Sequence, residues 1–161
     1  GVSEGSIFRR FESKKKLFAA AMTNQDPDWL DWLEPSTGGE TLRETLEQIS
    51  DSAIDHFLIV LPLFYRMVGS GLIEPHQLAS AFNEPHQRYA VRTLTRYPES
   101  ERRLGRIRAA DPEVVARGLL GARHMFAFFE IGGFNAVQPM PRATFVRGLV
   151  GQTLVVVANE A

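Results

Sequence analysis

Cysteine is absent from the 161-residue chain, which excludes disulfide bonds, thiolate metal ligands and a cysteine nucleophile. Long hydrophobic runs are also lacking. The longest, residues 57–65, contains Pro62 and falls well short of the about 20 residues that cross a membrane. No secretory signal precedes the first charged residues. We therefore expect a cytoplasmic protein with no membrane partner.

A strong net charge is lacking as well, because the formal charge is −1. Hydrophobic residues make up 44% of the chain and charged residues 23%, which is ordinary for a soluble domain with its own core. The charge is nevertheless uneven. Residues 1–24 hold five basic and two acidic side chains, whereas the rest is acidic on balance. A basic end on an acidic body suggests a nucleic-acid contact surface, although a merely solvated face would give the same cluster.

Apolar residues recur at steps of three and four from Thr41 to Val68, and this spacing predicts one amphipathic helix. Thr41 with Glu44 three residues later is a capping-box start. The tetrapeptide Glu-Pro-His-Gln occurs at 74–77 and 84–87, where proline suits the first turn of a helix better than the two histidines suit a metal site. No segment sustains the period-two alternation of a strand, so the predicted class is all-α.

The last third predicts two strong helices. One begins at Asp111, a capping residue followed by a first-turn proline, and ends at the glycine pair 132–133. The other opens near Pro141 and continues through residue 157. Both are apolar over a wider arc than one core needs, so each should contact more than one partner.

The first 18 residues carry the arrangement that a DNA-recognition helix needs. Ser3 suits the cap of a helix, and Ser13 suits the cap of the next one. Between them, Ser6, Arg9 and Arg10 point away from the apolar positions of their helix. Short polar side chains near the start of such a helix reach base edges in the major groove, while basic groups hold phosphates.

This stretch closely resembles the end of the DNA-binding domain of the TetR family of transcriptional regulators. The family pattern runs roughly Gly-Val-Ser, two residues, Thr, an aliphatic residue, Tyr, two residues, Phe, one residue, Ser-Lys-Glu, one residue, Leu. Ser6 stands at the threonine and Phe8 at the tyrosine. The resemblance implies phosphate contacts at Phe8 and Lys14, but Phe8 has no hydroxyl and can only pack. The predicted DNA-binding residues are Ser3, Ser6, Phe8, Arg9, Arg10 and Lys14.

The resemblance also implies a domain division and a function. Residues 1–24 would be the remainder of a helix-turn-helix head, and residues 25–161 a helical ligand-binding and dimerisation domain. The family's head has three helices and this chain starts at the turn before the third, so we expect poor operator binding by the chain as it stands. The implied function is a ligand-responsive transcriptional regulator, a repressor released from palindromic operator half-sites by a small-molecule effector.

Aromatic residues are frequent in the body, and small-molecule pockets are mostly apolar with a few polar anchors. We therefore expect a hydrophobic or aromatic effector, with His56, His124 and Arg123 as candidate anchors, although such a stripe can simply be core. The predicted pocket residues are Trp29, Trp32, His56, Phe57, Phe64, Tyr65, His124 and Phe128.

A two-fold homodimer is expected from the final two helices. Their wide apolar surface would be unusual on a monomer. Each helix also contains two glycines, which cost about 1 kcal/mol apiece against alanine and favour close approach of another backbone. Glycines that merely fit the internal core are the alternative. The predicted interface residues are Gly118, Ala122, Phe126, Phe129, Phe145, Leu149, Gly151 and Val156.

Two other functions remain open. Asp51, Asp55 and His56 could form an acid–base site, but solvated residues on a polar helix face explain them more simply. No phosphate loop, metal-spaced cluster or nucleophile motif is present, so we predict no enzyme activity, no metal and no cofactor. The second alternative is a dimeric helical small-molecule-binding module without a DNA-binding role.

Overall fold

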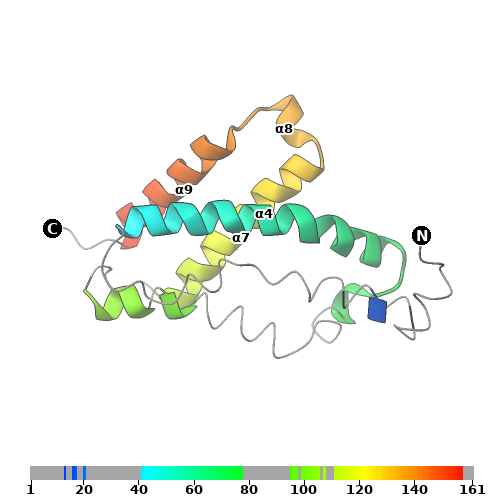
Figure 1. Cartoon of the computed structure of the whole chain (residues 1–161), viewed down its shortest axis with the longest axis horizontal. Coiled ribbons are helices and arrows are strands. Elements are labelled where there is room, and N and C mark those ends of the chain that lie inside the picture. Colours follow the sequence, from blue (N-terminus) through cyan, green and yellow to red (C-terminus); the bar gives the residue numbers. More distant parts are fainter. Residues whose placement is uncertain are drawn as a thin grey trace, which may run out of the picture.

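The computed structural model describes residues 13, 16, 17, 20, 41–77, 95–97, 99–105, 107 and 111–157. Its elements there are α4 (Leu42–Gly69), the 3-10 turn η1 (Pro75–Gln77), α7 (Pro112–Ile131), α8 (Phe134–Val137) and α9 (Arg142–Val157) (Figure 1). No β-strand occurs within these ranges, which confirms the all-α prediction. The first Glu-Pro-His-Gln segment forms only the single turn η1, and the second lies outside the described residues.

Helix α4 starts where the sequence predicts. The Thr41 hydroxyl accepts a hydrogen bond from the Glu44 backbone N–H at 3.2 Å, and the Glu44 carboxylate accepts one from the Thr41 backbone N–H at 2.9 Å. The two bonds satisfy donors that have no partner within the helix, so the capping box is confirmed. The helix ends at Gly69, and Gly71 then takes a positive φ of 68° in the turn that follows.

Helix α7 starts at a similar local signal. The Asp111 carboxylate accepts hydrogen bonds from the Glu113 and Val114 backbone N–H groups, and Pro112 occupies the first turn. At the other end a β-carbon on Gly132 would lie 2.7 Å from the Phe134 ring, and Gly133 has a positive φ of 74°. The glycine pair therefore permits the tight turn into α8 that folds Phe134 back onto α7.

The core lies where α7 and α9 pack on α4. In Figure 1, α7 crosses the middle of α4 and α9 returns along its N-terminal half. Leu46, Ile49 and Ala53 on α4 form one buried cluster with residues of α7 and α9. A second cluster joins Ile54 to Phe126 and Val146. These contacts place α4 as the common support of the last two long helices.

Helix α4 also has the length and apolar composition of a membrane-spanning segment. Its best window has a mean hydropathy of 1.3 and is 22% buried. Length and composition alone are weak evidence, because core helices of soluble proteins pass the same test. The helix also carries Asp51 and Asp55, whose charges would be costly inside a bilayer. In this structure α4 packs against both α7 and α9.

Candidate functional site

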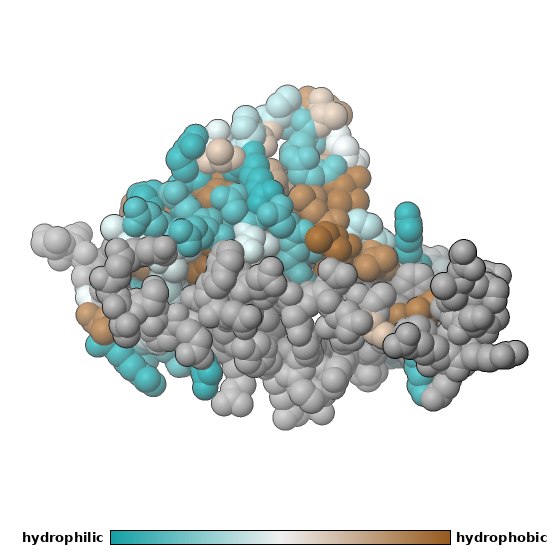
Figure 2. All heavy atoms as spheres, viewed as in Figure 1, coloured by the Kyte–Doolittle hydropathy of each residue, from teal (hydrophilic) through white to brown (hydrophobic). Residues whose placement is uncertain are grey.

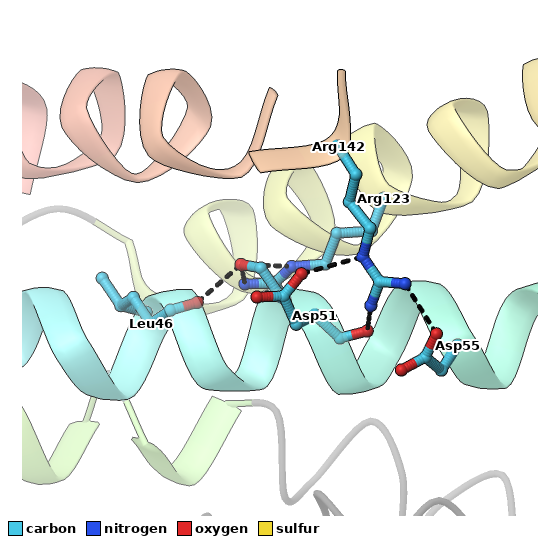
Figure 3. A network of polar contacts seen from close by, with 6 residues as sticks. Leu46, Asp51, Asp55, Arg123 and Arg142 are labelled. Carbon is cyan, nitrogen blue, oxygen red and sulfur yellow. Dashed lines mark hydrogen bonds and ion pairs between the residues drawn. The ribbon is translucent and has the colours of Figure 1, made fainter. Parts of the chain in front are cut away.

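A charged side chain stands in the middle of the buried stripe of α7. The stripe consists of Ala116, Leu119, Arg123, Phe126 and Ala127, at helical steps of three, four, three and one. Arg123 is only 1% exposed. A position that periodicity would assign to an apolar side chain therefore holds a guanidinium between α7 and α4 (Figure 3).

Ser50 of α4 holds this guanidinium in place. Arg123 donates from Nε at 3.1 Å and from Nη2 at 2.9 Å to the Ser50 hydroxyl oxygen. Ser50 is itself fully buried and donates its proton to the Leu46 carbonyl at 2.5 Å. Burial lowers the pKa of the Arg123 guanidinium to about 10, because the charged form loses its hydration. The group therefore remains protonated at neutral pH.

Aromatic rings continue along the contact between α4 and α7. Phe57 meets His124 edge-on with ring centroids 5.5 Å apart, and Tyr65 meets Phe128 edge-on at 6.0 Å. Phe64 lies edge-on to Tyr65 at 5.6 Å. We call these five residues the aromatic row. All five side chains are half-buried, and Figure 2 shows hydrophobic residues gathered where the C-terminal part of α7 meets α4.

The row brings together most of the predicted pocket residues. His56 joins it through a ring contact with Phe57 at 5.9 Å. Trp29 and Trp32 lie outside the described residues. Ser50 was missed by the sequence analysis, because nothing in a short hydroxyl on an amphipathic helix marks it as the partner of a residue more than 70 positions away. Among the described residues, no group of three or more metal-ligating side chains gathers.

The two carboxylates of the acid–base hypothesis are bound by an arginine. Arg142 of α9 donates from Nε to Asp51 at 2.8 Å and from Nη1 to Asp55 at 2.7 Å, and its Nη2 contacts the Asp51 backbone carbonyl (Figure 3). The hydrogen bond from Arg142 lowers the pKa of the Asp55 carboxyl and raises that of Arg142. The arrangement joins α4 to the start of α9, which favours a structural role over proton transfer.

The outer side of α7 has the opposite character. Val114, Gly118, Gly121, Met125 and Phe129 follow one another at helical spacing, opposite the buried stripe, and all are exposed. We call them the outer face of α7. A β-carbon built on Gly118 or Gly121 would meet no atom within 4 Å. These glycines therefore do not serve the packing of the described residues.

Helix α9 repeats the spacing. Gly148 and Gly151 are three residues apart, as Gly118 and Gly121 are, and a β-carbon on either would also meet nothing within 4 Å. Gly148 is exposed and lies opposite the buried residues Val146 and Val150, whereas Gly151 is half-buried and lies beside that exposed position. We call Gly148 and Gly151 the outer face of α9. Like the outer face of α7, it lies away from the buried residues through which the helix packs on α4.

The predicted interface residues divide between exposed and inner positions. Gly118, Phe129 and Val156 are exposed, whereas Ala122, Phe145, Leu149 and Gly151 are half-buried. Phe126 is a correction. It is 5% exposed, packs with Ile54 and Val146, and stacks on Phe145 with ring centroids 4.6 Å apart. Its ring fills the space between α4 and α9, so it is not available to a second chain.

The predicted DNA-binding residues Ser3, Ser6, Phe8, Arg9, Arg10 and Lys14 lie outside the described residues. The helix cap predicted at Ser13, next to these residues, is described by the structure. The Ser13 hydroxyl accepts a hydrogen bond from the Lys16 backbone N–H at 3.2 Å, and the Leu17 N–H bonds to the Ser13 carbonyl at 3.0 Å. Ser13 therefore starts a helical turn, as its sequence position predicts.

Comparison with known proteins gives one strong likeness of fold. No family model matches the sequence, and no curated protein matches it either. The crystal structure of a candidate TetR-family transcriptional regulator from Mesorhizobium loti superposes with a TM-score of 0.66 at 19% sequence identity. The match covers 99% of this chain and 82% of that chain. At this identity the likeness establishes a shared all-α fold.

Proposed function

We propose that this chain is a ligand-responsive DNA-binding transcriptional regulator of the TetR type. Residues 1–24 belong to its DNA-binding head, and residues 25–161 bind the effector and form the dimer. The shared fold and the pattern from Ser3 to Lys14 support this assignment. It acts in the cytoplasm as a repressor, has no enzymatic role, and leaves palindromic operator DNA when a hydrophobic or aromatic effector binds.

The outer faces of α7 and α9 carry the proposal. Four glycines in helix interiors cost about 1 kcal/mol each against alanine. All four have room for a β-carbon, so contacts among the described residues do not explain them. A second copy of the chain does, because glycine lets two helix backbones approach closely. Two helices from each copy form a four-helix interface, which would bury on the order of 2,000 Å² or somewhat less in total.

The aromatic row supplies the link between effector and dimer. A ligand seated along Phe57, His124 and Phe128 would contact both α4 and α7. Because α7 carries the outer face on its other side, a shift of α7 against α4 would change the angle between the two copies. Helix-turn-helix dimers read half-sites about one helical turn apart, so such a change would alter operator affinity.

Selection of DNA from a random pool tests the proposal. The protein should carry the two preceding helices of a TetR-type head, and the selected sequences should be palindromic. Lys14→Ala should weaken binding similarly for all sequences and flatten the salt slope by about 1, while Arg9→Ala or Arg10→Ala should relax base preference by about 1–3 kcal/mol. A dimer that selects no sequence would instead favour the dimeric binding module without a DNA role.

A further inference from the structure

Arg123 is a charge without a counter-charge in the part of the chain that the structure describes. Its two hydrogen bonds go to Ser50, a neutral hydroxyl that is already satisfied through its own bond to Leu46. A buried charge that is not paired with an opposite charge is expensive, because it loses its hydration without compensation. A charge kept at this position therefore points to a partner that the described residues do not supply.

The acidic residues of the neighbouring helices are engaged elsewhere. Helix α9 contains no acidic residue. On α4, Asp51 and Asp55 pair with Arg142. The two acidic residues of α7 also have partners close to them in the sequence. The remaining pairs are Glu44 with Thr41, Glu47 with Arg43, Glu113 with Arg117, and Glu130 with Asn135. None of these carboxylates is paired with Arg123.

One edge of the guanidinium makes no complete set of hydrogen bonds to the described residues. Ser50 occupies the edge formed by Nε and Nη2. Nη1 makes no hydrogen bond to a described residue, so the edge formed by Nη1 and Nη2 keeps its outward N–H groups. Two parallel N–H groups on one guanidinium edge match the two oxygens of a carboxylate, which makes the paired contact both strong and directional.

The surroundings indicate what the anion is attached to. On α4, Phe57 follows Ser50 by seven residues and therefore lies two turns farther along the same face, where it meets His124 at the start of the aromatic row. The row continues to Phe128 and Tyr65, farther along both helices. A charged group followed by half-buried rings suits a ligand with one acidic end and an apolar or aromatic remainder.

We propose that Arg123 binds the carboxylate of an amphipathic organic acid whose apolar part lies along the aromatic row. Ser50 acts as the positioning residue, because its hydroxyl accepts hydrogen bonds from Nε and Nη2 and leaves Nη1 for the ligand. This inference rests on the proposed function, in which the body binds a small effector. It narrows the effector from hydrophobic molecules in general to monocarboxylic acids with an apolar chain or ring.

Matched acids and amides test the proposal on the 161-residue chain. The probes are octanoate and 3-phenylpropionate, each compared with its uncharged amide by calorimetry and thermal unfolding. We expect the acids to bind at least about tenfold more tightly than the amides, as charge-assisted hydrogen bonds require. Arg123→Gln should abolish this preference, and Arg123→Lys should keep part of it. Arg117→Gln, on the exposed side of the same helix, is the control and should change nothing.

Stability of the ligand-free chain gives a second, independent readout. If the charge of Arg123 is compensated only when a ligand binds, Arg123→Met removes an uncompensated buried charge from the ligand-free chain. The Tm should then stay level or rise by a few degrees. A purely structural arginine predicts a fall in Tm instead. A fall would overturn the proposal even if the variant remained folded.

The remaining outcomes also decide the matter. Equal binding of acids and amides would refute the carboxylate site but leave a small-molecule-binding body intact. Stabilisation by inorganic phosphate as strong as that by octanoate would replace the organic acid with a general anion site. Absence of any effect of either acid would likewise reject the inference. The proposed regulator would still be judged separately, by DNA selection and by the mass of the chain in solution.

Discussion

Each of the two sides of α7 departs from the usual distribution of polarity. The inner stripe, which contacts α4, holds the buried guanidinium of Arg123. The outer face presents glycines and large apolar side chains, with Met125 49% and Phe129 41% exposed. Soluble helices normally bury apolar residues and expose charged ones. Each departure is unfavourable in an isolated chain. The two proposals assign a partner to each side: an anion inside and a second chain outside.

The largest difference between the inner and outer sides of α7 should appear when two phenylalanines three residues apart are each replaced by alanine. Phe126→Ala removes a buried ring from the cluster with Ile54 and Val146, and should lower the free energy of unfolding by about 3–5 kcal/mol. Phe129→Ala removes a half-exposed ring from the outer face, and should weaken self-association with much less effect on the fold of one chain. Chemical denaturation over a range of protein concentrations separates the two effects. Equal losses of stability in both variants would refute the distinction between inner and outer sides.

A glycine on the outer face should give the next largest effect. A leucine at Gly118 meets open space in the single chain and improves helix propensity, so the chain should remain folded. In a dimer it should hold the backbones apart and raise the dissociation constant at least about a hundredfold, as loss of a central contact does. Sedimentation equilibrium measures the change. The matched control is Gly69→Leu on α4, where a β-carbon also meets nothing and no interface is expected.

Removing the ion pairs between α4 and α9 should have the smallest effect on the stability of the folded chain. The side chains of Asp51 and Asp55 are 53% and 64% exposed, so solvent screening limits each pair to at most about 1 kcal/mol. Because the pKa of Asp55 is lowered in the folded chain, its contribution is present at neutral pH. It is lost as the pH falls below the ordinary value of 3.8. Asp55→Asn should therefore lower Tm slightly at pH 7, and this difference should shrink as the pH falls below 3.8. A difference that stays constant on acidification would contradict the assignment.

Local signals in the sequence predicted the ends of the helices. Thr41 with Glu44, Asp111 with Pro112, and Ser13 each place a hydrogen-bonding side chain within three residues of the N–H groups that it satisfies. Such caps depend only on neighbours in the chain, so no knowledge of the tertiary fold is needed. The all-α class followed from the same periodic and capping signals.

Contacts between residues far apart in the sequence could not be predicted from such local signals. Helix α7 is apolar on more than one side, and which side faces inward depends on how α4 and α9 dock. Phe126 was therefore assigned outward, although its ring packs in the core. Arg123 was recognised as a candidate anchor, but not as the centre of the buried stripe, because periodicity counts apolar residues alone. The pairing of Arg142 with Asp51 and Asp55 joins positions about 90 residues apart.

The mass of the unmodified chain in solution tests the central claim most directly, namely that a second copy covers the outer faces of α7 and α9. Light scattering at micromolar concentration should give twice the chain mass of 18.0 kDa, with dissociation only on strong dilution. A mass of 18.0 kDa that does not change with concentration would contradict the dimer, and with it the proposed link between effector binding and operator release.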